Sequence, residues 1–323
     1  MKTASAPAKA ILLGEHSSLY GNPALAMAID LRAKVTVSVR EDEQVNITAP
    51  GLGLENAPVK RNQRGTALVK RAARIYPGGY DISIESKIPL ASGLGSSAAI
   101  SAALIWALDA LNKKGSHMRS APEVQRLCEP QDSHMRFLQE EAQLCESEVH
   151  SKSSGLDTAA SIYGGVIKYQ NGVAEKLEIE NFPRLVIAHS GVESDTAEIV
   201  KAIEEINLKE PERMKFFLDE SERLVFLGET ALKAGDWEGL GKEMTENHRL
   251  LGKMGVSSIR MDALVDAALN AGAYGAKLCG AGRGGIMAAL VDEKSENGVK
   301  EALSRLDAKI IEEGICKKGV SLE

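Results

Sequence analysis

The spacing of hydrophobic and polar residues changes along the chain, from short strand-like runs in the first third to long helical stretches further on. Residues 33–39 alternate and are rich in valine, which predicts a strand, and we expect residues 45–48 to pair with it. The other predicted strands cover residues 8–13, 80–87, 164–169, 184–189, 275–279 and 285–291. Predicted helices cover residues 63–76, 97–111, 122–149 with a break near Pro130, 195–269 with breaks near Pro211, Gly235 and Gly255, and 294–303.

This order of elements is a strand-rich first half, a helical segment and a mixed end, which predicts an α+β protein. It does not follow the regular strand–helix–strand repeat of a Rossmann fold. A chain of 323 residues is long enough for two domains. We expect the boundary near residue 180, which gives domains of residues 1–180 and 181–323.

Composition narrows the class of protein. Hydrophobic residues make up 44% of the chain and aromatic residues only 4%, so the core must consist mainly of aliphatic side chains. The net charge is −6 and no long basic run occurs, which argues against a nucleic-acid partner. No apolar run is long enough to cross a membrane. The four cysteines lack CxxC spacing, which argues against zinc, and without a signal-peptide pattern we expect reduced thiols and a cytoplasmic location.

The segment Gly93–Ala99, GLGSSAA, is the sharpest candidate for a ligand site. Glycines let a backbone approach a ligand closely, and the helix that follows offers N–H groups and the positive end of its dipole to a phosphate. Ser96 and Ser97 add hydroxyls for phosphate or Mg²⁺. No Gly-Lys-Ser/Thr follows, so this is not a Walker A loop. Taken alone, the segment is equally typical of a helix N-cap with a flexible lead-in.

A second glycine-rich segment, KLCGAGRGG, spans residues 277–285 between two predicted strands. A simple turn needs one or two glycines, whereas four indicate a backbone packed closely against a ligand or another loop. Taken alone, it favours a tight hairpin loop.

Residues 7–21, PAKAILLGEHSSLYG, place Lys9 on a strand and Glu15 and His16 at its end. Lys9 would bring a positive charge close to a buried loop. The structural alternatives are a solvated lysine at a strand end and a hydrogen-bonded histidine in a turn.

Residues 153–157, SSGLD, place Asp157 after a glycine turn, at the head of an apolar stretch. Upstream, Glu146 and His150 are four residues apart and share one face of a predicted helix. The structural alternatives are an N-capping aspartate and an exposed polar helix face.

In their order and spacing, these segments resemble the three motifs of the GHMP kinases, which include galactokinase, homoserine kinase, mevalonate kinase and phosphomevalonate kinase. The sequence PAKAILLGEHSSLYGNPALAMAIDLR is similar to the first motif of the mevalonate kinase branch, PGK-hydrophobic-GEHAVVYG. Galactokinases resemble GEHTDYNGG there, phosphomevalonate kinases tend to carry Tyr at the position of His16, and homoserine kinases lack the Gly-Glu-His trio. Glu146 lies eleven residues before Asp157, the spacing of the magnesium-binding Glu and catalytic Asp in that branch, and His150 matches a histidine found there.

The sequence departs from the family pattern at several positions. Ser17-Ser18-Leu19 replaces Ala-Val-Val, Ser153-Ser154 replaces a small-Pro-Ser lead, Arg283 interrupts the glycines of the third motif, and Cys279 stands where Thr is common. These changes concern the substrate pocket and leave Lys9, Ser97, Glu146 and Asp157 in place.

The resemblance implies a two-domain GHMP kinase fold with the active site in the cleft between the domains. It implies transfer of the ATP γ-phosphoryl group to the 5-hydroxyl of mevalonate, with Asp157 and Lys9 as catalytic residues and Ser97 and Glu146 as Mg²⁺ ligands. Glu15 and His16 would line the mevalonate end together with Lys9 and Asp157. The ATP-binding residues implied are Pro89, Gly93, Leu94, Gly95, Ser96, Ser97, Ala98, Gly280, Ala281 and Gly282.

The resemblance also implies a homodimer and leaves two alternatives open. One is another GHMP kinase, such as a phosphomevalonate kinase or a sugar kinase, which would share the ATP site and differ near residues 15–20. The other is a catalytically silent regulator, against which the presence of Lys9, Ser97, Glu146 and Asp157 argues.

Overall fold

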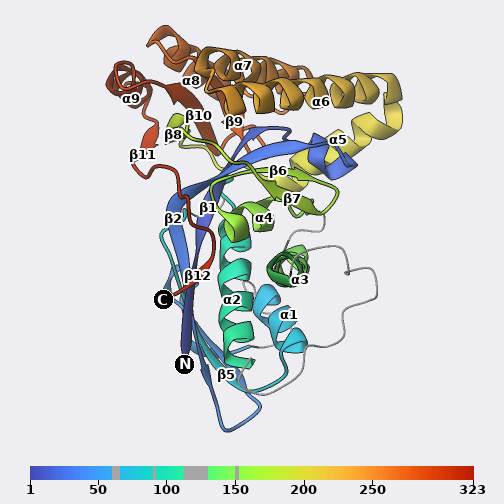
Figure 1. The fold of residues 1–323 in the computed structure, drawn as a ribbon, viewed down its shortest axis with the longest axis vertical. Helices are drawn as coiled ribbons and strands as arrows, with labels where there is room; N and C mark the ends of the chain where they lie inside the picture. The colour runs from blue at the N-terminus through green and yellow to red at the C-terminus, as the bar shows by residue number, and fades with distance from the viewer. Residues whose placement is uncertain (60–65, 90–91, 113–129, 150–152) are drawn as a thin grey trace.

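The computed structural model describes residues 1–59, 66–89, 92–112, 130–149 and 153–323. Its elements form two lobes, each built on one β-sheet, and both chain termini lie at the lobe with the larger sheet (Figure 1). We call them the large-sheet lobe and the small-sheet lobe. The predicted α+β fold class is confirmed.

The large-sheet lobe contains an eight-stranded sheet with the strand order β12-β1-β2-β5-β3-β4, and β6 and β7 extend from β2. The strands are β1 (Lys2–Leu13), β2 (Ala24–Val39), β3 (Val45–Ala49), β4 (Leu54–Pro58), β5 (Tyr80–Ser86), β6 (Val166–Gln170), β7 (Val173–Lys176) and β12 (Ser321–Leu322). Its helices are α1 (Ala67–Ile75), α2 (Ser96–Asn112), α3 (Pro130–Ser147) and α4 (Leu156–Tyr163). The short 3₁₀ helices η1 (Ser17–Tyr20) and η2 (Pro50–Leu52) follow β1 and β3.

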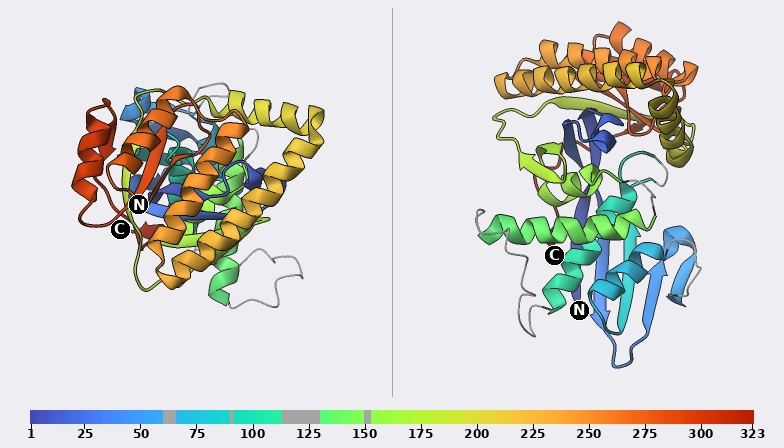
Figure 2. Two further views of the ribbon diagram at one scale, coloured as in Figure 1. Left: turned by 90° about the horizontal axis from the view of Figure 1, so that it is seen from above. Right: turned by 90° about the vertical axis from the view of Figure 1, so that its right-hand side faces the viewer.

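The small-sheet lobe contains a four-stranded antiparallel sheet with the order β11-β8-β10-β9. Its strands are β8 (Arg184–His189), β9 (Gly275–Cys279), β10 (Ile286–Val291) and β11 (Lys309–Ile311). Its helices are α5 (Thr196–Lys209), α6 (Pro211–Ala234), α7 (Trp237–Lys253), α8 (Ile259–Asn270) and α9 (Glu296–Ser304). Helices α6, α7 and α8 cover the end of the molecule opposite the termini (Figure 2).

Helix boundaries in the small-sheet lobe follow the predicted breaks. Pro211 occupies the first turn of α6, where a missing N–H costs nothing, and Gly235 ends that helix with φ 69°. The described part of α3 starts at Pro130. The predicted helical residues 122–129 lie outside the described residues.

One predicted strand pairing is wrong. β3 pairs in parallel with β5 and antiparallel with β4, and it does not pair with residues 33–39. Those residues of β2 already have β5 on one edge and β1 on the other, so no edge is left for β3.

Helix α2 is the central helix of the large-sheet lobe. It is apolar on nearly all sides and packs on β1 and β2, with α1, α3 and α4 beside it. One hydrophobic core runs through both lobes, because Leu13 and Leu25 of the large sheet share a buried cluster with Val225, Cys279 and Ile286 of the small-sheet lobe. The long strands β1 and β2 therefore reach the small-sheet lobe at one end.

The C-terminal segment returns to the large-sheet lobe. Ile315 bridges to Ile29, and β12 pairs with β1. The domain boundary predicted near residue 180 falls between β7 and β8 and stays a prediction.

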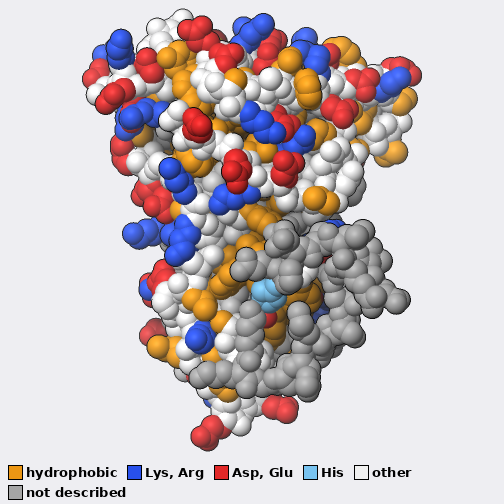
Figure 3. Space-filling model, viewed as in Figure 1, with side chains coloured by type: hydrophobic (Ala, Val, Ile, Leu, Met, Phe, Trp, Pro, Cys, Tyr) orange, Lys and Arg blue, Asp and Glu red, His pale blue; other side chains and the backbone are white. Residues whose placement is uncertain are grey.

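The surface carries interspersed acidic and basic side chains on the face shown in Figure 3. In the part of the chain that the structure describes, no helix combines the length and the hydrophobicity needed to span a bilayer.

Candidate active site

An ion pair between Lys9 and Asp157 lies at the centre of the candidate site. Their side chains meet at 3.0 Å between Nζ and Oδ2. The lysine is buried on β1, and its ammonium also donates to the carbonyl of Gly93 at 3.0 Å. Asp157 remains 29% exposed, so a small molecule can reach its carboxylate. The structure thus excludes the alternative of a solvated Lys9.

Helix α4 aims Asp157 at Lys9. Gly155, with φ 87°, precedes this helix, and a Cβ there would lie 2.5 Å from the Tyr169 hydroxyl. Thr158 donates to the carbonyl of Gly155 at 2.9 Å and fixes the first turn. Asp157 therefore sits in the first turn, where the helix dipole favours a carboxylate.

Glu146 of α3 is a second carboxylate in this place, and it is 3% exposed. Burial, and next the negative charge of Asp157, raise the pKa of Glu146 to about 8. Ser153 donates to its Oε2 at 3.0 Å, and this bond and the Lys9 charge act in the opposite direction. A buried carboxylate beside another carboxylate is a favourable ligand for a cation.

Residues 93–97, which we call the glycine-serine loop, approach the ion pair through Gly95. Gly95 has φ 75°, and a Cβ on it would lie 3.1 Å from Cε and Cγ of Lys9. Helix α2 begins at Ser96, whose hydroxyl is buried without a partner among the described residues. The first turn of α2 offers backbone N–H groups and the positive end of the helix dipole to an anion.

The predicted ATP-binding residues of this loop differ in exposure. Leu94 and Ala98 are fully buried, so neither offers its side chain to a ligand. Pro89 is exposed and accepts a hydrogen bond from the Ser92 hydroxyl at 2.8 Å. Ser97 lies in the first turn of α2.

The third motif forms the connection between the antiparallel strands β9 and β10, as its hairpin alternative predicted. Its glycines pack against other loops. A Cβ on Gly280 would lie 3.4 Å from Cα of Gly93, and a Cβ on Gly282 would lie 2.1 Å from the carbonyl of Val256. Gly285 similarly approaches the carbonyl of Ser92. Loop packing thus explains most of these glycines, and it brings Gly280 against Gly93 of the glycine-serine loop.

His16 follows β1 in the left-handed region, with φ 62°. Its Nε2 lies 2.9 Å from the carbonyl of Ala281, so the histidine joins the first and third motifs. Because a carbonyl only accepts, Nε2 carries the proton. Burial lowers the pKa of His16.

Glu15 lies in the interior, in contrast to the expectation that it lines the mevalonate end. It is 1% exposed, its Oε1 pairs with Lys277, and its Oε2 accepts from Asn247 at 2.8 Å. Both oxygens are occupied by these two side chains. No sequence pattern assigned a partner to Glu15, although an isolated lysine in the apolar strand GAKLC is a signal of a buried ion pair.

Arg32 and Arg283, two basic residues whose direction the sequence leaves open, both bond to groups other than Asp157. Arg32 donates to the C-terminal segment at Lys318 and Gly319. Arg283 pairs with Glu198 at 3.0 Å. His150, Lys152 and Cys128 lie outside the described residues. The described cysteines Cys145, Cys279 and Cys316 are buried free thiols.

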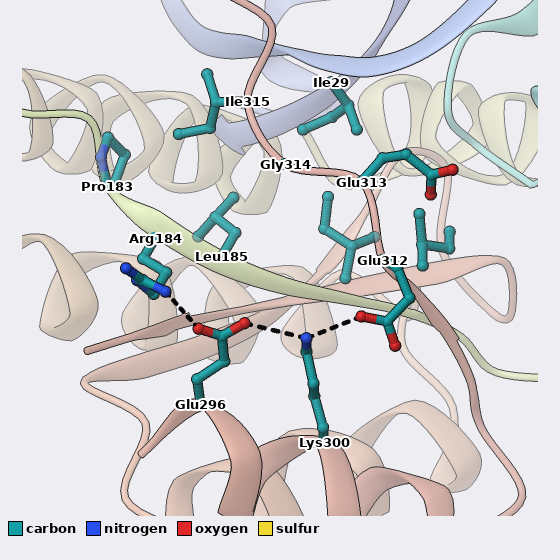
Figure 4. Close-up of a pocket in the computed structure, with 12 residues that line it drawn as sticks. Ile29, Pro183, Arg184, Leu185, Glu296, Lys300, Glu312, Glu313, Gly314 and Ile315 are labelled. Carbon is teal, nitrogen blue, oxygen red and sulfur yellow. Dashed lines mark hydrogen bonds and ion pairs between the residues drawn. The ribbon is translucent and has the colours of Figure 1, made fainter. Parts of the chain in front are cut away.

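A separate hollow of about 250 Å³ lies between β8, α9 and the segment 311–315 (Figure 4). Its floor is apolar, and its charged rim residues pair with one another. Glu296 binds Arg184 at 2.6 Å and Lys300 at 3.0 Å, and Lys300 also binds Glu312 at 2.9 Å. None of the site residues predicted from the sequence lines this hollow, so it is not the candidate site.

Comparisons with known proteins agree with this geometry. Residues 63–165 match the family model "GHMP kinases N terminal domain", and residues 229–309 match "GHMP kinases C terminal". The chain is 36% identical to the mevalonate kinase of Methanothermobacter thermautotrophicus, over 89% of each chain. It is 34% identical to that of Thermococcus gammatolerans, over 99% of this chain and 98% of the other. The crystal structure of the Methanococcus jannaschii mevalonate kinase is similar with a TM-score of 0.77 and 26% identity, over 97% of this chain and 98% of that one.

Proposed function

This chain belongs to the GHMP kinase family, alongside its mevalonate kinases, and from that premise we propose that it phosphorylates mevalonate with ATP. The products are 5-phosphomevalonate and ADP, and the reaction belongs to isoprenoid biosynthesis by the mevalonate pathway. The observation that carries the proposal is the buried Lys9 paired with an accessible Asp157, where the first and third motifs meet.

Phosphoryl transfer depends mainly on positioning and charge neutralisation. In the proposed mechanism, the acceptor hydroxyl approaches Asp157, which takes its proton or orients it. The ammonium of Lys9, held by Asp157 and Gly93, stabilises negative charge that develops on the hydroxyl oxygen. The loop Gly93–Gly95 and the first turn of α2 hold the ATP phosphates, with residues 280–282 on the other side.

Mg²⁺ fits the residues present. Glu146 is a buried carboxylate with a raised pKa, and Ser97 lies in the first turn of α2 next to Ser96, which has a buried hydroxyl without a partner among the described residues. Magnesium needs only one or two protein ligands when phosphates supply the others. We propose Glu146 and Ser97 as those ligands, and the ion would neutralise charge on the β- and γ-phosphates.

At the acceptor end, we propose that His16 faces mevalonate and that Glu15 supports His16 from the interior. A homodimer and a cytoplasmic location also remain part of the proposal. Sedimentation of the purified protein tests the dimer.

The function is tested by ADP release from purified protein with ATP and Mg²⁺ against mevalonate, phosphomevalonate, galactose and homoserine. Turnover with mevalonate alone is expected. Turnover with another of the four instead would show that the protein is a kinase and that its acceptor is not mevalonate. No turnover with any of them would favour the silent regulator.

A further inference from the structure

A network of buried polar groups joins the two lobes directly behind the His16 turn. Lys277 of β9 is 0% exposed and forms an ion pair with Glu15. The same ammonium donates to the carbonyl of Ile11 at 3.3 Å and to that of Leu278 at 2.7 Å. An ammonium group has three donors, so all three are used.

Helix α7 fixes both members of this pair. Asn247 donates to the second carboxylate oxygen of Glu15 at 2.8 Å. The next residue, His248, accepts at Nδ1 from the backbone N–H of Leu278 at 3.3 Å. The network therefore contains residues of β1, α7 and β9, and each charged group in it has fixed partners.

The network lies next to the groups that form the candidate site. His16 follows Glu15 directly, and Ala281 lies four residues after Lys277 on the same hairpin. The hydrogen bond from His16 to Ala281 thus links the same two segments as the ion pair does. Gly280, which precedes Ala281, is in close contact with the backbone of Gly93.

Stability alone is a poor explanation for this pair. Removing two charges from water costs about as much as their attraction returns, and apolar side chains of similar volume often stabilise a core equally well. A buried pair is directional, however, because its members cannot separate without leaving an unpaired charge in the interior. It therefore fixes the relative position of the two segments that carry it.

We propose that Lys277 is a positioning residue for phosphoryl transfer, and that it acts through Glu15 to hold His16 and residues 280–282 in place beside Gly93, whose carbonyl accepts from Lys9. This inference rests on the proposed function and extends it to residues that touch neither the acceptor nor ATP. It assigns Lys277 an effect on turnover that is separate from its effect on folding.

The test is a double variant, Glu15→Gln with Lys277→Met, which removes both charges at once and leaves neither unpaired. Its matched control is Lys168→Met with Glu229→Gln. Lys168 of β6 and Glu229 of α6 pair at 2.7 Å and also join the two lobes, but they lie outside the motif segments. We expect both double variants to fold, with melting temperatures within a few degrees of each other.

At a temperature well below melting, kcat should fall about tenfold to a hundredfold in the first double variant, as expected for misplaced reacting groups. In the control, kcat should stay within about twofold, because this pair contacts none of the segments that carry the candidate site. A wild-type kcat in the first double variant would overturn the proposal. Equal losses in both would also overturn it, because they would assign the effect to lobe docking in general.

A second readout does not depend on mevalonate turnover. In ¹⁵N-histidine-labelled protein, the His16 signal, assigned by its loss in His16→Gln, should titrate closer to the ordinary histidine pKa in the first double variant than in the wild type. An unchanged His16 titration would contradict the proposed positioning. If the wild type failed to phosphorylate mevalonate, the proposed function would fail, and this titration would still decide the role of Lys277.

Discussion

Two carboxylates near Lys9 differ in environment, and this difference separates their roles. Asp157 is accessible and paired with the lysine at 3.0 Å. Glu146 is buried, and burial with the nearby charge of Asp157 raises its pKa to about 8. An accessible carboxylate suits proton transfer, whereas a buried one that favours its protonated form suits a site that receives a cation.

The role of Asp157 predicts the effect of Asp157→Asn. The amide keeps the shape but cannot take a proton and loses the ion pair with Lys9, so kcat should fall by about 10³-fold or more. ATP affinity, measured by calorimetry, should change little. The control is Asp195→Asn, because Asp195 caps α5 by accepting from two backbone N–H groups and asparagine caps equally well. Near-wild-type turnover of Asp157→Asn would refute the mechanism.

The environment of Glu146 predicts a pH-dependent stability. Its folded-state pKa of about 8 lies above the ordinary glutamate pKa of 4.5, so the folded state binds this proton more tightly than the unfolded state. The contribution is fully present below the lower value and is lost as pH rises towards the upper one. In Glu146→Gln the side chain stays neutral at every pH, so the variant does not lose stability in this way as pH rises. The variant should therefore melt above the wild type near pH 8, and the difference in melting temperature should shrink towards pH 5.

Thermal melts of both proteins across this pH range, without Mg²⁺ or nucleotide, measure the effect. The control is Glu212→Gln, because Glu212 is exposed to water. A melting difference between wild type and Glu146→Gln that does not vary with pH would contradict the prediction.

At the scale of elements, the site depends on glycines that let three loops meet. Gly95 shows this most clearly, because its φ of 75° and its distance to Lys9 both disfavour a side chain. The loop that would hold phosphate is thus also the surface against which the catalytic lysine packs.

Gly95→Ala should therefore lower activity more than its backbone strain explains. The added Cβ would lie 3.1 Å from two carbons of Lys9 and must displace that side chain. We expect kcat to fall by about tenfold or more, since small misplacements of reacting groups are costly. The control is Gly235→Ala, because Gly235 has φ 69° with nothing near its Cβ, so it shares the strain without the contact. Equal effects on kcat in the two variants would show that strain alone is responsible.

Local signals in the sequence predicted most elements, and long-range contacts account for the rest. Pro211, Gly235 and Gly255 mark helix ends through their own backbone preferences, so the breaks between α5, α6, α7 and α8 were predictable. The parallel pairing of β3 with β5 was not, because strand partners are chosen by the whole sheet.

The candidate site likewise contains residues that the sequence could identify and residues whose role depends on long-range contacts. The resemblance identified Lys9 and Asp157, and the structure brings them together. It did not identify the Lys277–Glu15 pair, whose members are 262 residues apart in sequence. A buried ion pair has no local pattern, because each partner satisfies the other only in the folded chain.

At the scale of the whole molecule, one hydrophobic cluster spans both lobes, and the C-terminal segment ties the last residues back to the first sheet. Cys316 donates its backbone N–H to Ala28, and Val320 donates to Ile162. The chain thus ends in the lobe where it began (Figure 1). Folding of the large-sheet lobe consequently needs residues from both ends of the sequence.

Arg32 is the side chain that holds this closure, and Arg32→Lys tests it. The guanidinium donates to the carbonyls of Ser5 and Gly319, each at 2.9 Å, and to that of Lys318 at 3.3 Å. Lysine keeps the charge but cannot reproduce this planar set of donors, so the free energy of unfolding should fall by about 1–3 kcal/mol. Denaturant unfolding measures the loss, and hydrogen exchange should show weaker protection at Cys316 and Val320.

The matched control is Arg40→Lys, because Arg40 also makes several bonds, to Asp42 and Asp81, but these partners lie at the surface. Exposed ion pairs contribute little, so its unfolding free energy should change by less than about 1 kcal/mol. Because the bonds of Arg32 reach residues that follow the small-sheet lobe in sequence, its loss should release the C-terminal segment before the rest of the molecule unfolds. If exchange at Cys316 and Val320 were unchanged while global stability fell, Arg32 would stabilise the sheet alone, and the closure would depend on the β1–β12 pairing.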